Sequence, residues 1–111
     1  MSRDEIPPGT LYLLILKTLA VRGVLHGYEI AESIQHHSED ILQVEEGSLY
    51  PALQRMLRQG WLDSETGTSA KGRPTRIYRL TATGVRHLDD EIPSFEKMFA
   101  GITRVLAAAK A

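Results

Sequence analysis

Two segments near the start of the chain carry apolar residues at helical spacing. Residues 10–22, TLYLLILKTLAVR, place apolar side chains three and four positions apart, with Thr10 as an N-cap and Gly23 as a C-terminal stop. Residues 26–37, HGYEIAESIQHH, follow the same spacing over a shorter length. We therefore predict one helix in each segment.

A third apolar stripe follows the polar connection SEDILQVEE. Its members would face inward: Leu49, Leu53, Met56 and Leu57. Gly60 would end this helix. A proline inside a helix costs about 3 kcal/mol, but with Gly47 or Ser48 as N-cap, Pro51 falls in the first turn, where its missing N–H costs nothing. The stretch GSLYP is therefore predicted to start the third helix.

The apolar spacing changes after this helix. Residues 61–66, WLDSET, and residues 75–81, TRIYRLT, have the composition of strands, and Trp61 is expected in the core. Between them, GTSAKGRP is rich in turn-forming residues and longer than a tight two-residue turn. The pattern predicts a hairpin with a protruding basic tip.

The last segment begins at Thr81, a natural N-cap, and carries a heptad-like apolar seam. The seam consists of Val85, Leu88, Ile92, Phe95, Phe99, Ile102 and Leu106. Roughly 30 residues would make a helix about 45 Å long, too long for so small a core to cover. The seam therefore predicts a homodimer, with folding back over the first three helices as the alternative. Pro93 predicts a kink or break near residues 89–92.

Charge is unevenly distributed along a chain whose formal net charge is only −1. Residues 47–88 contain seven basic residues against two acidic ones, a net of five positive charges, whereas acidic residues crowd both flanks. The basic residues are Arg55, Arg58, Lys71, Arg73, Arg76, Arg79 and Arg86. A chain segregated in this way can present one basic face while staying nearly neutral overall.

The face of the third helix opposite its apolar stripe is polar and basic and lacks carboxylates. It carries Ser48, Tyr50, Pro51, Gln54, Arg55 and Arg58. Such a face suits a DNA major groove, and backbone N–H groups of Leu49 and Tyr50 would be free to meet a phosphate. The alternative is an ordinary solvated helix face.

The hairpin tip strengthens the nucleic-acid interpretation. Lys71, Gly72, Arg73 and Arg76 place cations on a protruding loop that could neutralise phosphates or enter a minor groove. Three helices followed by a basic hairpin predict a winged helix-turn-helix.

Four stretches of the chain resemble the PadR family, the phenolic acid decarboxylase regulators. They are GTLYLLILKTLA, HGYEIAESI, QVEEGSLYPALQRMLRQGWL and GRPTRIYRLTATG, within residues 9–88. The resemblance implies a dimeric winged-helix repressor of the smaller subgroup, with one C-terminal helix forming the dimer. It implies that Ser48, Tyr50 and Pro51 open the recognition helix and that Lys71, Gly72 and Arg73 lie in the wing. Phe95 and Phe99 stand where such proteins often carry a tryptophan.

The sequence favours neither an enzyme nor a metalloprotein. There is no cysteine, and adjacent His36 and His37 have no carboxylate at metal-ligand spacing. Ser48 lies in no Gly-x-Ser-x-Gly turn, and no glycine-rich phosphate loop is present. No apolar run approaches membrane-spanning length, and MSRDEIPPGT lacks the pattern of a signal peptide. We expect a cytoplasmic protein without cofactors.

The sequence as a whole predicts a mainly α, α+β winged helix-turn-helix, with a DNA-binding domain at residues 1–80 and a dimerisation helix at residues 81–111. The predicted function is a sequence-specific repressor on a pseudo-palindromic operator, released by a small aromatic or amphipathic effector near the dimer seam. The DNA-binding residues would be Ser48, Tyr50, Pro51, Gln54, Arg55, Arg58, Lys71, Gly72, Arg73 and Arg76. A dimeric winged-helix module that binds protein instead of DNA is the competing interpretation.

Overall fold

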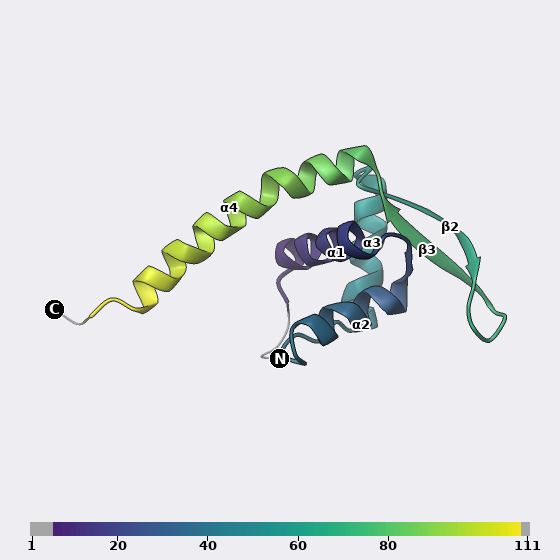
Figure 1. Ribbon diagram of the computed structural model, residues 1–111, viewed down its shortest axis with the longest axis horizontal. Helices are drawn as coiled ribbons and strands as arrows, with labels where there is room; N and C mark the ends of the chain where they lie inside the picture. Colours follow the sequence, from purple (N-terminus) through teal and green to yellow (C-terminus); the bar gives the residue numbers. More distant parts are fainter. Residues whose placement is uncertain (1–5, 110–111) are drawn as a thin grey trace.

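The protein folds as three helices, a β-hairpin and a long final helix (Figure 1), in a computed structural model that describes residues 6–109. The elements are α1 (Pro8–Arg22), β1 (Leu25–His26), α2 (Gly27–His37), α3 (Glu46–Arg58), β2 (Leu62–Thr68), β3 (Pro74–Leu80) and α4 (Ala82–Leu106). The order and type of the predicted elements are confirmed, as is the mainly helical winged-helix class. The molecule is elongated, with extents of 61 × 30 × 22 Å, because α4 and the hairpin project in opposite directions.

A three-stranded antiparallel sheet of order β1-β3-β2 includes one strand that the sequence did not predict. Strand β1 is two residues long, and Leu25 pairs with Tyr78 of β3. Strands β2 and β3 pair from Leu62↔Leu80 out to Thr68↔Pro74. Strand β2 is therefore one residue longer than predicted, and β3 has the predicted length but starts one residue earlier. The connecting loop comprises only residues 69–73.

Helix α1 starts before the predicted cap. Pro7 is its N-cap and Pro8 is the first helical residue, so the assignment of Thr10 as N-cap is wrong. Proline suits this position because its fixed φ matches the helix and its missing N–H would have no helical partner there. At the other end, Gly23 has a φ of 88° and its N–H donates to the Leu19 carbonyl at 2.8 Å, which confirms the predicted stop.

One hydrophobic core joins the helices to the sheet. Its fully buried side chains include Ile15, Leu16, Ile30, Leu49, Leu53, Met56, Leu62 and Tyr78. The predicted inner face of α3 is confirmed for Leu49, Leu53 and Met56, whereas Leu57 is only half-buried. Tyr78 brings the largest of these side chains from β3, so the base of the hairpin is held by the same core as the three helices.

The start of α4 is joined tightly to the end of α3. The Thr81 side chain caps α4 by accepting from the Gly84 N–H at 3.0 Å, as predicted, and donates to the Gly60 carbonyl at 2.6 Å. A Cβ on Gly84 would overlap the carbonyl oxygen of Trp61. The Trp61 ring stacks on His87 with centroids 4.0 Å apart and is half-buried against the core. Only glycine permits this approach of α4.

Helix α4 runs through Pro93 without interruption over 25 residues. The ribbon bends gradually (Figure 1), so the kink or break predicted near residues 89–92 is wrong. Pro93 is exposed, and water can therefore solvate the carbonyl of Asp89, which loses its helical partner. Among the described residues, no helix has the length and apolar character needed to cross a membrane.

The predicted apolar seam of α4 divides into two parts. Leu88 is buried at 4% exposure and Ile92 packs against the core, so the chain itself covers these two members. The assignment of Leu88 to a partner interface is wrong, because α4 crosses α1 there. The members that remain exposed are Val85, Phe95, Phe99, Ile102 and Leu106. Beyond residue 95, the seam residues Phe99, Ile102 and Leu106 are at least half exposed within the described residues.

The contact at Gly84 yields a direct test by substitution of two helical glycines. Gly84→Ala should lower the free energy of unfolding by about 1–3 kcal/mol, because the added methyl group meets backbone. The control is Gly101→Ala on the exposed part of α4, where nothing lies within 4 Å of a Cβ. That change should raise helix stability by about 0.5–1 kcal/mol. Urea unfolding measures both, and equal effects of the two variants would contradict the close approach.

Candidate nucleic-acid interface

The outer face of α3 is exposed along its length and carries the predicted DNA-contacting side chains. The exposed members are Tyr50, Pro51, Gln54, Arg55 and Arg58. Ser48 is half-buried on the side of α3 that faces α1. There, Ser48, Arg55 and Arg58 line a groove of about 340 Å³ whose other wall is the start of α1. The outer face of α3 thus extends from a groove beside α1 to the side of α3 that lies near α2.

Helix α3 starts earlier than predicted, which changes the role of its proline. The first helical residue is Glu46 and the N-cap is Glu45, so neither Gly47 nor Ser48 is the N-cap. Pro51 is therefore the sixth helical residue, and its placement in the first turn is wrong. Because Pro51 has no N–H, the Gly47 carbonyl loses its helical partner. Both residues are exposed, so solvent can satisfy that carbonyl.

The backbone donors at the start of α3 are also used differently from the prediction. The N–H groups of Ser48 and Leu49 both donate to the Glu45 carbonyl, at 3.0 and 2.9 Å. Tyr50 is the fifth helical residue, so its N–H belongs to the regular helical hydrogen-bond pattern. The prediction that Leu49 and Tyr50 leave donors free for a phosphate is wrong. Anion contacts from α3 must come mainly from side chains farther along the helix.

Tyr50 lies against the start of α2. A Cβ on Gly27 would be 3.1 Å from Cε1 of the Tyr50 ring, so the ring covers the backbone of α2 at this point. Tyr50 as a whole is nonetheless 41% exposed. Gly27 therefore sets how closely Tyr50 and α2 approach, a contact that helical periodicity alone could not have identified.

The end of α3 leads directly into the hairpin. The Trp61 N–H donates to the Met56 carbonyl and the Gly60 N–H to the Leu57 carbonyl, each at 3.0 Å. With Gly60 at a φ of 78°, this is a Schellman motif. The predicted stop at Gly60 is confirmed, and it fixes the direction in which β2 leaves α3.

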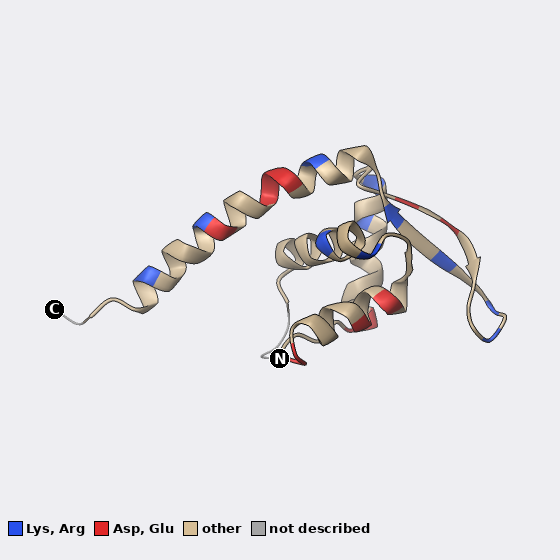
Figure 2. Cartoon of the chain, in the orientation of Figure 1, with Lys and Arg blue, Asp and Glu red and all other residues tan. Residues whose placement is uncertain are grey.

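The hairpin tip is a compact loop that presents two cations. The Ser69 N–H donates to the Arg73 carbonyl at 2.8 Å, and the Ser69 hydroxyl accepts from the Arg73 N–H at 3.1 Å. Gly72 has a φ of 79°, which glycine adopts without strain. Lys71 and Arg73 are exposed on this loop, which projects beyond the helices (Figure 2). Ser69 is a positioning residue that the sequence analysis missed.

The pairing of β2 with β3 places two arginines of β3 on opposite faces of the sheet. Arg76 shares its face with buried Tyr78 and donates to the Ser64 hydroxyl at 3.0 Å. Arg79 lies on the other face and forms an ion pair with Glu65 at 2.8 Å. Arg76 is thus directed toward the helices, whereas the charge of Arg79 is offset by an acid. Ser64 could be identified only once the strand register was known.

The predicted phosphate-binding cations have no acidic partner within residues 6–109. The ion pairs there are Arg79–Glu65 and a longer His87–Glu91 contact of 4.0 Å. Neither involves Arg55, Arg58, Lys71, Arg73 or Arg76. Figure 2 shows basic residues along β3 and the hairpin tip, and acidic residues on β2, on α2 and in the middle of α4. The described part of the chain holds no group of three His, Cys, Asp or Glu side chains suited to a metal ion.

Tyr78 connects the start of α3 electrostatically to the hairpin. Burial raises the pKa of the Tyr78 phenol above 10.0, Arg76 acts to lower that pKa, and Tyr50 acts to raise it. The combined result is a phenol held neutral beneath the junction of α3 and β3. Tyr50 and Arg76, both predicted site residues, therefore lie near the same buried hydroxyl.

The raised pKa of Tyr78 predicts how stability changes in alkaline solution. The folded state holds the phenolic proton more tightly than the unfolded state, whose ordinary pKa is 10.0. This contribution to stability is complete below pH 10.0 and is lost as pH rises through the folded-state pKa. Tyr78→Phe should make the decline in free energy of unfolding shallower above pH 10.0, while Tyr28→Phe at an exposed position should not. Parallel declines in wild type and Tyr78→Phe would contradict this.

Comparison with known proteins agrees with this geometry. A model of the transcriptional regulator PadR-like family matches residues 15–90. A PadR family transcriptional regulator from Eggerthella lenta is similar with a TM-score of 0.76 and 30% identity, over 91% of this chain and 85% of that one. A transcriptional regulator from Clostridium thermocellum has a TM-score of 0.76 and 26% identity, over 86% of this chain and 92% of that one.

A third structure, Bacillus subtilis PadR in complex with operator DNA, shares the fold with a TM-score of 0.68 and 24% identity. The similarity covers 78% of this chain and 48% of that one, so the chain spans about half the length of that protein. The family match confirms the resemblance drawn from the sequence and the predicted function of transcriptional regulator. Because the family model covers most of the winged-helix fold, this chain belongs to the PadR-like family of transcriptional regulators.

Proposed function

We propose that the protein is a cytoplasmic, homodimeric repressor that binds a pseudo-palindromic operator with α3 in the major groove. The observation that carries the proposal is which cations of α3 and the hairpin form an ion pair and which do not. Those on the outer face of α3 and on the inner face and tip of the hairpin have no ion pair within residues 6–109, while Arg79 on the outer sheet face has one. Unpaired cations on neighbouring elements suit phosphates, whose neutralisation dominates protein–DNA affinity.

The exposed side chains of α3 divide by chemistry into reading and positioning groups. Gln54 and Arg55 present amide and guanidinium donors that can contact base edges in pairs. Ser48 and Tyr50 offer hydroxyls to the sugar–phosphate backbone of the DNA. At Pro51, the surface of α3 is open to close approach by the DNA. The phosphate-binding set is Arg58, Lys71, Arg73 and Arg76, with Gly72 shaping the tip. This assignment rests on exposure, charge and position on the two elements.

The exposed half of α4 supports a dimer interface. Phe95 and Phe99 stack with ring centroids 6.2 Å apart, and Phe99 is 60% exposed. The other exposed apolar residues nearby are Met98, Ile102, Val105 and Leu106. A second copy would bury this stripe and space two recognition helices about 34–36 Å apart, one turn of DNA. Residues 1–80 then act as the DNA-binding unit and residues 81–111 as the dimerisation helix.

The same stripe is the proposed place for an effector. A small aromatic or amphipathic molecule could pack on the Phe95 and Phe99 rings where two α4 helices meet. Its binding would release the repressor if it favoured a dimer whose two α3 helices no longer match the operator spacing. The exposure of both rings supports this placement.

Arginine substitutions test the phosphate contacts. Arg73→Ala should weaken binding to all duplexes and reduce the slope of log affinity against log salt by about one unit. Arg79→Ala is the matched control, because Arg79 is already paired with Glu65 on the opposite face. Fluorescence anisotropy at several salt concentrations measures both variants. If duplex binding by the wild type does not depend on salt, the protein-interaction module is favoured. If the salt slope of Arg73→Ala equals that of the wild type, the hairpin tip is not part of the DNA interface.

The dimer interface is tested by adding one carboxylate at either of two neighbouring sites on α4. Phe99→Glu should convert the protein to monomers, because an ionised side chain would be buried among apolar groups. Ala100→Glu lies outside the apolar stripe and should leave the dimer intact. Sedimentation at micromolar concentration reports the mass of each. A dimeric Phe99→Glu variant, or a wild-type monomer, would rule out this interface.

A further inference from the structure

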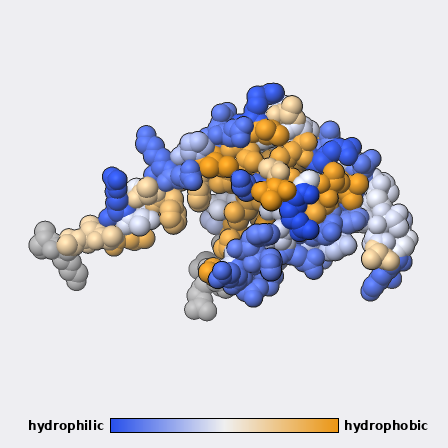
Figure 3. All heavy atoms as spheres, in the orientation of Figure 1, coloured by the Kyte–Doolittle hydropathy of each residue, from blue (hydrophilic) through white to orange (hydrophobic). Residues whose placement is uncertain are grey.

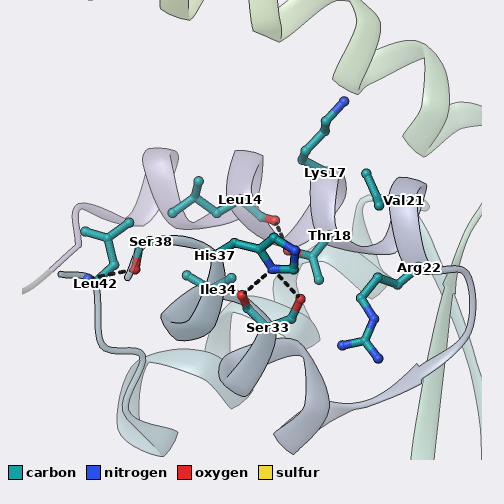
Figure 4. Close-up of a pocket in the computed structure, with 10 residues that line it drawn as sticks. All are labelled: Leu14, Lys17, Thr18, Val21, Arg22, Ser33, Ile34, His37, Ser38 and Leu42. Atoms are coloured by element: carbon teal, nitrogen blue, oxygen red, sulfur yellow. Dashed lines mark hydrogen bonds between the residues drawn. The ribbon is translucent and has the colours of Figure 1, made fainter. Parts of the chain in front are cut away.

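A second candidate ligand site lies between α1 and α2, on elements that the proposed function leaves unassigned. It is a cleft of about 300 Å³, at the lower end of the range for small-molecule pockets. Figure 3 shows hydrophobic surface on this face of the molecule, interrupted by hydrophilic residues. The close-up in Figure 4 shows α1 along one side of the cleft and α2 along the other.

The surface of the cleft is mostly apolar, and four aliphatic side chains contribute to it. Leu14 and Val21 come from α1, Ile34 from α2, and Leu42 from the segment that follows α2. The polar groups between them are largely satisfied: the Thr18 hydroxyl donates to the Leu14 carbonyl at 2.7 Å, and the Leu42 N–H donates to the Ser38 hydroxyl at 3.0 Å. No Phe, Tyr or Trp lines the cleft within the described residues, so the only ring in this part of its lining is the His37 imidazole.

One end of the cleft is basic. Arg22 and Lys17 are exposed on α1, and neither has an ion pair within residues 6–109. In Figure 4, the Arg22 side chain extends from α1 toward α2, whereas Lys17 points away from His37. The lining contains no Asp or Glu in the part of the chain described. Because Leu42 lies at the other end, the cleft has a basic end and an aliphatic end.

His37 forms a fixed wall between the two ends. Its Nδ1 lies 2.9 Å from the Ser33 carbonyl oxygen and 3.3 Å from the Ser33 hydroxyl. A carbonyl can only accept, so Nδ1 carries the proton and donates to it. Ser33 is itself buried, at 4% exposure, so its two oxygens hold the His37 ring from beneath. The wall is therefore in place before any ligand enters.

We propose that this cleft binds an aliphatic carboxylate of medium chain length. The carboxylate lies against the Arg22 guanidinium, whose planar donors match it, and Lys17 adds positive charge at the rim. The chain runs along Leu14 and Ile34 toward Leu42. Leu14 and Arg22 are eight residues apart on one helix, a span of about 12 Å. At roughly 1.2 Å per bond, an extended chain of about ten carbons covers that span, and octanoate covers about 8 Å of it.

Ligand chemistry provides the first test, by calorimetric titration of the intact protein with four compounds. Octanoate should bind with a dissociation constant of about 0.1–1 mM. Octanol, which keeps the chain without the charge, and octylammonium, which reverses the charge, should each bind at least about tenfold more weakly. Octanol or octylammonium matching octanoate would overturn the role of Arg22. Tighter binding of 2-naphthoate would overturn the aliphatic assignment.

Arginine substitution locates the octanoate site. Arg22→Gln should weaken octanoate binding about tenfold, because a charged hydrogen-bond partner is lost. Arg104→Gln removes a guanidinium from the far end of α4 and should leave octanoate affinity unchanged. Equal affinities in both variants would place octanoate elsewhere and overturn the proposal.

A pair of substitutions at Val21 separates a small anion from a second copy of the chain as the occupant. Val21 is 66% exposed, so the fold accepts a charged side chain there. Val21→Glu should abolish octanoate binding by repulsion, while Val21→Lys should retain it, and both should keep the sedimentation mass of the wild type. If both variants lose octanoate, or if both shift the protein to monomers, the cleft is not a carboxylate site. Duplex affinity measured without octanoate should be unchanged in both, so this outcome is independent of the proposed DNA function.

Discussion

The close approach of α4 to the end of α3 determines how the functional parts of this protein are arranged. Gly84 lies against the Trp61 carbonyl, and Thr81 joins the cap of α4 to the Gly60 carbonyl. The end of α3, the entry to the hairpin and the start of α4 therefore meet within a few residues. Since these are contacts to backbone, rotating α4 relative to α3 would require breaking hydrogen bonds. Any partner held by α4 consequently fixes the orientation of α3.

The sheet provides the second constraint, because it decides which cations can act together. In the β2–β3 register, Arg76 shares a face with Tyr78 and bonds to Ser64, whereas Arg79 is on the other face with Glu65. Within the hairpin, the positive charge that has no ion pair in the described residues thus lies on the side of α3 and at the tip. A chain with a net charge of −1 presents a basic binding surface in this way.

Much of the fold could be predicted from apolar periodicity, because most helices here bury one face. The inner face of α3 and the Thr81 cap followed directly from spacing and residue type. The start of α3 could not be predicted, because Glu45 caps the helix through its backbone carbonyl and not through a favoured side chain. Strand β1 is too short to leave a pattern. The burial of Leu88 depends on where α4 crosses α1, which a single heptad seam cannot reveal.

The candidate site was likewise predictable from the sequence only in part. Residue type and position were sufficient to select the exposed cations of α3 and the hairpin tip. The residues that hold them in place were missed, since Ser64 and Ser69 act through strand register and loop geometry. Gly27 was missed because its role depends on the Tyr50 ring from another helix.

Amide hydrogen exchange with and without a duplex that the protein selects from its own genome tests the central claim most directly. The account predicts slower exchange in the second half of α3 and in residues 69–76 of the hairpin, with no change upon DNA addition in residues 100–106 of α4. Exchange that slows on the exposed stripe of α4, while α3 and the hairpin remain unchanged, would contradict the assignment of the DNA-binding surface.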